Sequence, residues 1–166
     1  MEKLKELVKK EQNSIIIFSL FFISFYTYLK TLAPTVLWGD NARLSMLAFD
    51  PKFRVIMDYP LHSWLGKIFS LIPFGEFTFR QNFMSAFFGS LTIVFLFLII
   101  KNITKSEIVA FLSSLSFAFS HTFWFLSVMN EAYVLAMFFI SLQIYFLIIW
   151  FRENKNIFLY FAAFLF

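Results

Sequence analysis

Several ionisable side chains lie between Pro34 and Pro73, in a polar segment flanked by two long apolar runs. The segment contains Asp40, directly after a Trp-Gly pair. Its other candidate site residues, including one at the start of the next apolar run, are Arg43, Arg54, Asp58, Tyr59, His62 and Arg80. Charged groups beside a bilayer core are costly and are a default sign of a functional site. A carboxylate among cations suits the removal of a proton from an incoming hydroxyl and the stabilisation of a leaving phosphate.

A second, shorter polar segment runs from His121 to Glu131 and separates two later apolar runs. In neither segment do histidines and carboxylates have the spacing of a known metal motif. The chain has no cysteine, which excludes disulfides and thiolate metal sites. These observations leave a metal site of hard oxygen ligands open, because Asp40, Asp58 and Glu131 could together bind Mg²⁺ or Mn²⁺.

Each candidate residue also has a simpler interpretation. Asp40, Asp58 and Glu131 stand where helices are expected to begin, so each could act only as a helix cap or a partner of the helix dipole. The arginines could contact lipid head groups, and the two histidines could be solvated or lie in an aromatic belt. The combination of a carboxylate, several cations and an amphipathic stretch in one segment favours a site for a lipid-linked phosphate.

The elements that position these residues follow from composition. The chain is 60% hydrophobic, and 28 of its 166 residues are Phe, which is typical of an all-α polytopic membrane protein. A spanning helix needs about 20 apolar residues. Runs of that kind are 14–33, 83–100, 108–126 and 132–151, and a shorter fifth run is 157–166. We expect four complete spans and a partial fifth in a single membrane domain after residues 1–13, within a fragment of a longer protein.

Positive charge predicts the topology. The first 13 residues and the short segments 101–107 and 152–156 are basic, whereas the segment from His121 to Asn130 has no Lys or Arg. By the positive-inside rule the N-terminus is cytoplasmic, and the first run is a retained span rather than a signal peptide. Residues 34–81 and 121–131 then share the extracytoplasmic face and could form one site. The net charge of +4 lies mostly at the ends of apolar runs, which indicates a membrane lipid surface and no nucleic-acid partner. As the location we expect a bacterial plasma membrane rather than the endoplasmic reticulum.

Two short helices are predicted in the first extracytoplasmic segment. One spans 41–49 after Asp40, and the other spans 60–72. In the second, a stripe at helical spacing contains Leu61, Trp64, Leu65, Ile68, Phe69 and Ile72. This helix is too short to cross a bilayer, so we expect it to lie in the interface plane with the opposite face, which carries His62, toward water.

Five short motifs follow one another along the chain. They are Gly39-Asp40, Tyr59-Pro60-Leu61, Arg80 with Asn82, Phe123-Trp124, and Glu131 with Tyr133. In this order they resemble the N-terminal part of the DUF2723 family, which is similar to the protein O-mannosyltransferases and other GT-C membrane glycosyltransferases. Many family members carry an acidic residue where this chain has Arg43, and a His-Pro-Pro-Gly where it has residues 55–58.

The resemblance implies that the full-length protein transfers a sugar from a polyprenyl-phosphate carrier to an acceptor hydroxyl on the extracytoplasmic side. Asp40 would then be the general base or a carboxylate that orients the acceptor, and a nearby Arg or His would hold the carrier phosphate. Because the relatives by resemblance are mostly metal-independent, we expect no metal and no other cofactor. The expected partners are membrane lipid and the lipid-linked sugar, while the acceptor is left open. The alternatives are a non-catalytic membrane protein that binds or transports the lipid carrier, and a structural or assembly module.

Overall fold

The computed structural model describes residues 2–37, 39–49 and 59–165, with only the backbone for residues 2–12. These residues form helices and no strand, which confirms the predicted all-α class. The helices are α1 (Glu2–Lys30), α2 (Asp40–Phe49), α3 (Pro60–Ser70), α4 (Phe77–Thr104), α5 (Glu107–Ala118), α6 (His121–Ser127), α7 (Ala132–Glu153) and α8 (Asn156–Phe164). Arg54 and Asp58 lie outside the described residues.

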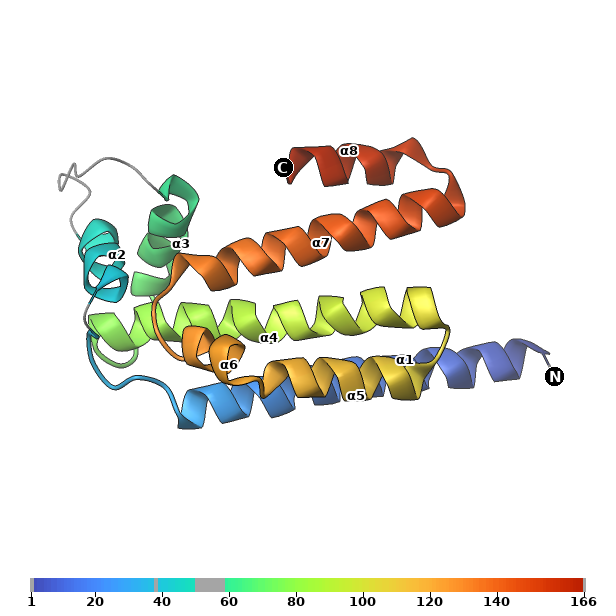
Figure 1. Ribbon diagram of the computed structural model, residues 1–166, viewed down its shortest axis with the longest axis horizontal. Coiled ribbons are helices and arrows are strands. Elements are labelled where there is room, and N and C mark those ends of the chain that lie inside the picture. Colours follow the sequence, from blue (N-terminus) through green and yellow to red (C-terminus); the bar gives the residue numbers. More distant parts are fainter. Residues whose placement is uncertain (1, 38, 50–58, 166) are drawn as a thin grey trace.

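Long apolar helices form the body of the protein. Among the described residues, the 13–30 part of α1, the whole of α4 and the whole of α7 are long and apolar enough to cross a membrane. α4 lies between α7 on one side and α1 and α5 on the other, and α8 folds back along α7 (Figure 1). The protein is therefore polytopic, with α4 as its central helix.

The third apolar run is bent, whereas one continuous span over 108–126 was predicted. α5 ends at Ala118, α6 begins at His121, and the two axes differ by 66°. At the bend the carbonyl oxygen of Phe117 accepts hydrogen bonds from the backbone N–H of Ser120 at 3.1 Å and from the Ser120 hydroxyl at 2.8 Å, so this end of α5 is closed locally. α5 and α6 are long and apolar enough to cross a membrane only as one bent span.

Small residues bring the helices into close contact around an aromatic core. A methyl group added to Gly89 of α4 would lie 2.6 Å from Oγ of Ser127, so α6 can approach only because this position is glycine. The hydroxyl of Tyr28 donates to the carbonyl oxygen of Ala118 at 2.9 Å and ties α1 to the end of α5. The buried core is Leu20, Tyr28, Ala86, Ile93, Phe97, Ala110, Ala118 and Phe123.

The two short helices α2 and α3 lie together at one end of the bundle, beside the start of α4 and the turn between α6 and α7 (Figure 1). The prediction that His62 faces water is wrong. His62 and Gly66 are buried against the protein, whereas Trp64 and Ile68 of the apolar stripe are 71% and 58% exposed. The cause is close packing: a methyl group added to Gly66 would lie 2.5 Å from Oε1 of Gln81. The small and polar face of α3 therefore packs on α4, and the apolar face points outward.

Candidate active site

Three buried asparagines join the elements at this end of the bundle. Oδ1 of Asn82, in the second turn of α4, accepts hydrogen bonds from Nδ2 of Asn41 at 3.2 Å and from the backbone N–H of Asn130 at 2.8 Å. Nδ2 of Asn82 donates to the carbonyl oxygen of Ala33 at 2.8 Å. All three side chains are fully buried. We call Asn41, Asn82 and Asn130 the asparagine network, and Asn82 is its centre.

Serines extend this network on both sides. Nδ2 of Asn130 donates to Oγ of Ser45 on α2 at 3.2 Å, and the backbone N–H of Glu131 donates to Oγ of Ser85 on α4 at 3.3 Å. Buried polar groups are costly unless they are paired, so a connected network of this kind fixes the elements in one arrangement. The first polar segment and the α6–α7 turn, predicted to share one face, are in fact directly joined.

The network places two carboxylates next to its own members. Asp40 is the exposed first residue of α2 and precedes Asn41, whereas Glu131 follows Asn130 and is only 8% exposed. Burial, and secondarily the negative charge of Asp40, raise the pKa of the Glu131 carboxyl. The two carboxylates therefore interact. Asp40 remains open to an incoming group, while Glu131 lies in a drier environment that favours its protonated form.

His62 is the most unusual buried side chain at the site. It is 2% exposed, and neither of its ring nitrogens has a hydrogen-bond partner of acceptable geometry. Burial lowers the pKa of His62 to about 4, although the nearby side chain of Asn130 partly opposes this effect. The ring is therefore neutral at neutral pH. Its burial and its interaction with Asn130 place it against the asparagine network, away from the water that was predicted to surround it.

Arg80 holds the end of α3. Its Nη1 donates to the carbonyl oxygens of Ser70 and of Ile72, the latter at 3.0 Å. The neighbouring Gln81 donates from Nε2 to the carbonyl oxygen of Gly66 at 2.9 Å. These contacts satisfy carbonyls at the C-terminal end of α3, and they give Arg80 a positioning contact within the protein. Phosphate binding by Arg80 stays a prediction.

The remaining candidates lie around the network. Arg43 is half-buried on α2, one turn after Asp40, and Tyr59 is the exposed residue that precedes α3. His121 is exposed at the start of α6, where its ring lies parallel to that of Phe125 at 6.3 Å between centroids. The structure thus brings together Asp40, His62 and Glu131, while His121 is not part of the hydrogen-bonded network.

Sequence reasoning did not assign a role to the asparagines or to their serine partners. A signal was available, because Asn41 and Asn130 stand next to the candidates Asp40 and Glu131, and Asn82 stands two positions after Arg80. Uncharged polar residues at the edge of apolar helices are used for contacts between helices in membranes. Among the described residues, no group of three His, Asp or Glu side chains is placed to hold a metal ion.

Comparison with known families identifies the chain. The profile of the protein O-mannosyl-transferase TMEM260 N-terminal domain matches residues 58–166, about two thirds of the chain. The chain belongs to this TMEM260 N-terminal domain family. The match covers α3 to α8 and therefore includes Asn82, Asn130 and Glu131. It supports the predicted kinship with protein O-mannosyltransferases, although it does not bear on membership of DUF2723 or of the GT-C class.

A curated relative supports the same family. The protein O-mannosyl-transferase tmem260 of Dictyostelium discoideum is 28% identical over 153 residues, which is 90% of this chain. Because the alignment covers 90% of this chain, its range extends to α2, which lies before the matched family domain. The chain corresponds to only 18% of the length of this relative. No solved structure matches the TMEM260-type chain described here.

Proposed function

We propose that this chain is the N-terminal membrane part of a glycosyltransferase that moves a sugar from a polyprenyl phosphate to an acceptor hydroxyl. The observation that carries the proposal is the placement of Asp40 beside Glu131 by the buried asparagine network. A network that is costly to bury and that ends in two interacting carboxylates is typical of a functional site. Membership of the TMEM260 N-terminal domain family supports this reaction class, because the family description names a protein O-mannosyl-transferase.

In the proposed reaction the exposed Asp40 carboxylate takes the proton of the acceptor hydroxyl. The hydroxyl oxygen then forms a bond to the anomeric carbon of the sugar, and the bond from that carbon to the phosphate oxygen breaks. The bonding electrons leave with the lipid phosphate, whose added negative charge needs a cation nearby. Arg43 lies on the same helix, one turn after Asp40, and would stabilise the negative charge on the leaving phosphate.

Glu131 has a different part in this proposal. Burial and, secondarily, the negative charge of Asp40 raise the pKa of Glu131, which favours a protonated carboxyl at this position. A protonated Glu131 can donate a hydrogen bond to the phosphate or the sugar, which an ionised carboxylate cannot. The pair would thus combine a base and a hydrogen-bond donor within one site.

The charge distribution supports an extracytoplasmic location for this site. Lys101 and Arg152 lie at the opposite ends of α4 and α7 from the network, near the N-terminal end of α1 (Figure 1). There Nζ of Lys101 contacts Glu107 at 2.8 Å, and Nη1 of Arg152 donates to Oδ1 of Asn102 at 2.6 Å. By the positive-inside rule this basic end faces the cytoplasm, and the carboxylates face the other side.

The experiment that tests the proposed function uses the full-length protein in lipid vesicles with a panel of polyprenyl-phosphate sugars and hydroxyl acceptors. We expect transfer from at least one lipid-linked donor. Binding of polyprenyl phosphate without transfer from any donor, by a folded protein, would contradict the enzyme and support a carrier-binding protein instead. The absence of both binding and transfer would contradict either function.

A further inference from the structure

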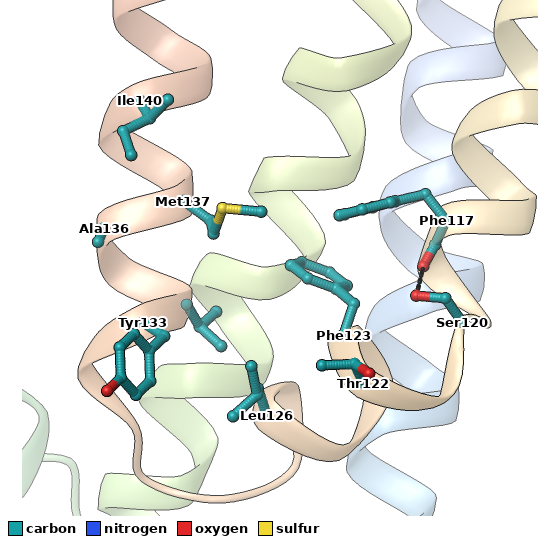
Figure 2. Close-up of a pocket in the computed structure, with 10 residues that line it drawn as sticks. Phe117, Ser120, Thr122, Phe123, Leu126, Tyr133, Ala136, Met137 and Ile140 are labelled. Atoms are coloured by element: carbon teal, nitrogen blue, oxygen red, sulfur yellow. Dashed lines mark hydrogen bonds between the residues drawn. The ribbon is translucent and has the colours of Figure 1, made fainter.

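An apolar groove lies below the candidate site, between the bent pair α5–α6 and the first turns of α7. Its volume is about 390 Å³, within the range of small-molecule sites. Figure 2 shows the lining side chains converging from the two sides, with Phe117 and Phe123 opposite Met137. The hydroxyl of Ser120 is turned to the carbonyl oxygen of Phe117, so it is satisfied within the wall. The groove is therefore apolar and open on one side.

The bend between α5 and α6 creates this groove. Because α6 departs from the axis of α5 by 66°, the space beside α7 that a straight span would fill is left open. On α7 the lining residues Tyr133, Ala136, Met137 and Ile140 follow an i, i+3, i+4, i+7 pattern and so form one face of the helix. At 1.5 Å per residue this face is about 10 Å long, and it runs parallel to the spanning helix.

The surroundings of the groove restrict what can occupy it. Its α7 wall belongs to a helix that meets the criteria for a membrane span, and Ile140 and Met137 are 50% and 39% exposed. In a bilayer these side chains face hydrocarbon rather than water. A narrow apolar space that runs along the membrane normal, to a depth of about 10 Å within one leaflet, fits an extended hydrocarbon chain.

The groove also ends at the candidate site. Tyr133 lines its outer end, and Glu131 lies two residues before Tyr133, at the N-cap of α7. A lipid chain seated in the groove with its head group at the outer end would place that head group at the N-terminal end of α7, where Glu131 is the N-cap residue. We propose that the groove holds the first part of the polyprenyl chain of the sugar donor, next to its phosphate. This proposal rests on the proposed function, because it assigns the lipid part of that same substrate.

A photocrosslinking experiment on the full-length protein tests the occupant directly. A diazirine amino acid of about the size of methionine is placed at Met137, and the matched control carries it at Ile144, which is 42% exposed on α7 but does not line the groove. The probe is radiolabelled polyprenyl phosphate in phosphatidylcholine vesicles. We expect at least tenfold more labelling at position 137 than at 144, and loss of that labelling with excess unlabelled polyprenyl phosphate.

Three outcomes would overturn the proposal. Equal labelling at positions 137 and 144 would mean that the groove does not select the carrier. Labelling at 137 that excess polyprenyl phosphate leaves unchanged, with phosphatidylcholine as the crosslinked species, would mean that it holds bulk lipid. A crosslink from 137 to another segment of the full-length protein would mean that protein fills it.

A kinetic comparison separates this proposal from the proposed function. Ala136→Phe would fill the groove, and Ile144→Phe is the control outside it. We expect Ala136→Phe to raise KM about tenfold for a long-chain donor and to leave KM unchanged for a donor with a short, water-soluble chain. An equal effect on both donors would overturn the groove assignment. If the wild-type protein transferred sugar from neither donor, the proposed function would fail, whereas the crosslinking result would still decide what the groove holds.

Discussion

The negative charge of Asp40 raises the pKa of Glu131, although the two residues are about 90 positions apart in the sequence. Burial of Glu131 acts in the same direction and is the larger cause. The two segments lie close together because Asn41 and Asn130, the neighbours of the two acids, are both hydrogen-bonded to Asn82. The start of α2 and the α6–α7 turn, which are separated in the sequence by α3, α4, α5 and α6, thus meet through one buried side chain, and they carry the two acids on which the proposed chemistry depends.

Replacement of Asp40 should change the titration of Glu131. In Asp40→Asn we expect the pKa of Glu131 to move down toward its ordinary value while staying above it, because burial persists after the charge is removed. The measurement is an infrared titration of the carboxyl bands, with Glu131→Gln used to assign the band. Glu76→Gln, at an exposed position, is the matched control and should leave the Glu131 band unchanged. An unaltered pKa of Glu131 in Asp40→Asn would show that the two acids do not interact.

Asn82 should be a strong determinant of stability. Asn82→Ala removes two acceptor contacts and one donor contact, and leaves the buried N–H groups of Asn41 and Asn130 without that partner. We expect a loss of about 3 kcal/mol in the free energy of unfolding, since each unsatisfied buried polar group costs about 1–3 kcal/mol. Unfolding in detergent measures this loss. The control is Thr27→Ala, which removes a hydroxyl bonded to the carbonyl oxygen of Ile23 within its own helix and should change stability by less than about 0.5 kcal/mol.

His62 should make the docking of α3 sensitive to acid. Its pKa is about 4 in the folded protein against 6.5 for an exposed histidine, so the unfolded or undocked state binds more protons between these values. Stability is therefore unaffected above pH 6.5 and falls as the pH drops toward 4, by about 3 kcal/mol in total. Unfolding measured from pH 7 to pH 4 should show this slope for the wild type.

A variant separates His62 from the other titrating groups. His62→Gln cannot titrate, so its stability should vary less with pH over the same range, whatever its absolute value. His121→Gln changes the exposed histidine and should retain the wild-type slope. A slope that survives in His62→Gln would contradict the burial of a neutral His62.

Gly66 should be required for the contact between α3 and α4. In an ordinary helix interior, Gly→Ala stabilises by about 1 kcal/mol. Here the added methyl would lie 2.5 Å from Oε1 of Gln81 and 3.0 Å from Cβ of Ala48, so we expect Gly66→Ala to destabilise by about 1–3 kcal/mol. Lys67→Ala, at the next and exposed position, is the control in the same unfolding assay. Stabilisation by Gly66→Ala would show that α3 does not pack closely on α4.

The membrane fold could be predicted from the sequence because run length and composition alone decide which segments suit a bilayer. The bend at Ser120 could not, since neither Pro nor Gly marks it and its polar groups are satisfied locally by Phe117. The orientation of α3 was also beyond reach. An apolar stripe normally faces protein or lipid, and only the fit of Gly66 against Gln81 shows which.

The candidate site was predictable in part. Asp40 and Glu131 are conspicuous because charges beside apolar runs are rare. The meeting of their segments was expected only as a consequence of topology, and the means of contact was missed because an asparagine carries no charge and has no fixed spacing. The roles of Arg54 and Asp58, which lie outside the described residues, remain predictions from the sequence.

The measurement that tests the central claim most directly is sugar transfer from a polyprenyl-phosphate donor by the full-length protein in vesicles, with the wild type beside Asp40→Asn and Glu76→Gln. The account predicts that Asp40→Asn lowers kcat/KM by about 10²–10⁴-fold, as expected for loss of a general base, while protein folding and donor binding persist and Glu76→Gln stays near the wild type. Transfer by a folded Asp40→Asn variant at the wild-type rate would contradict it.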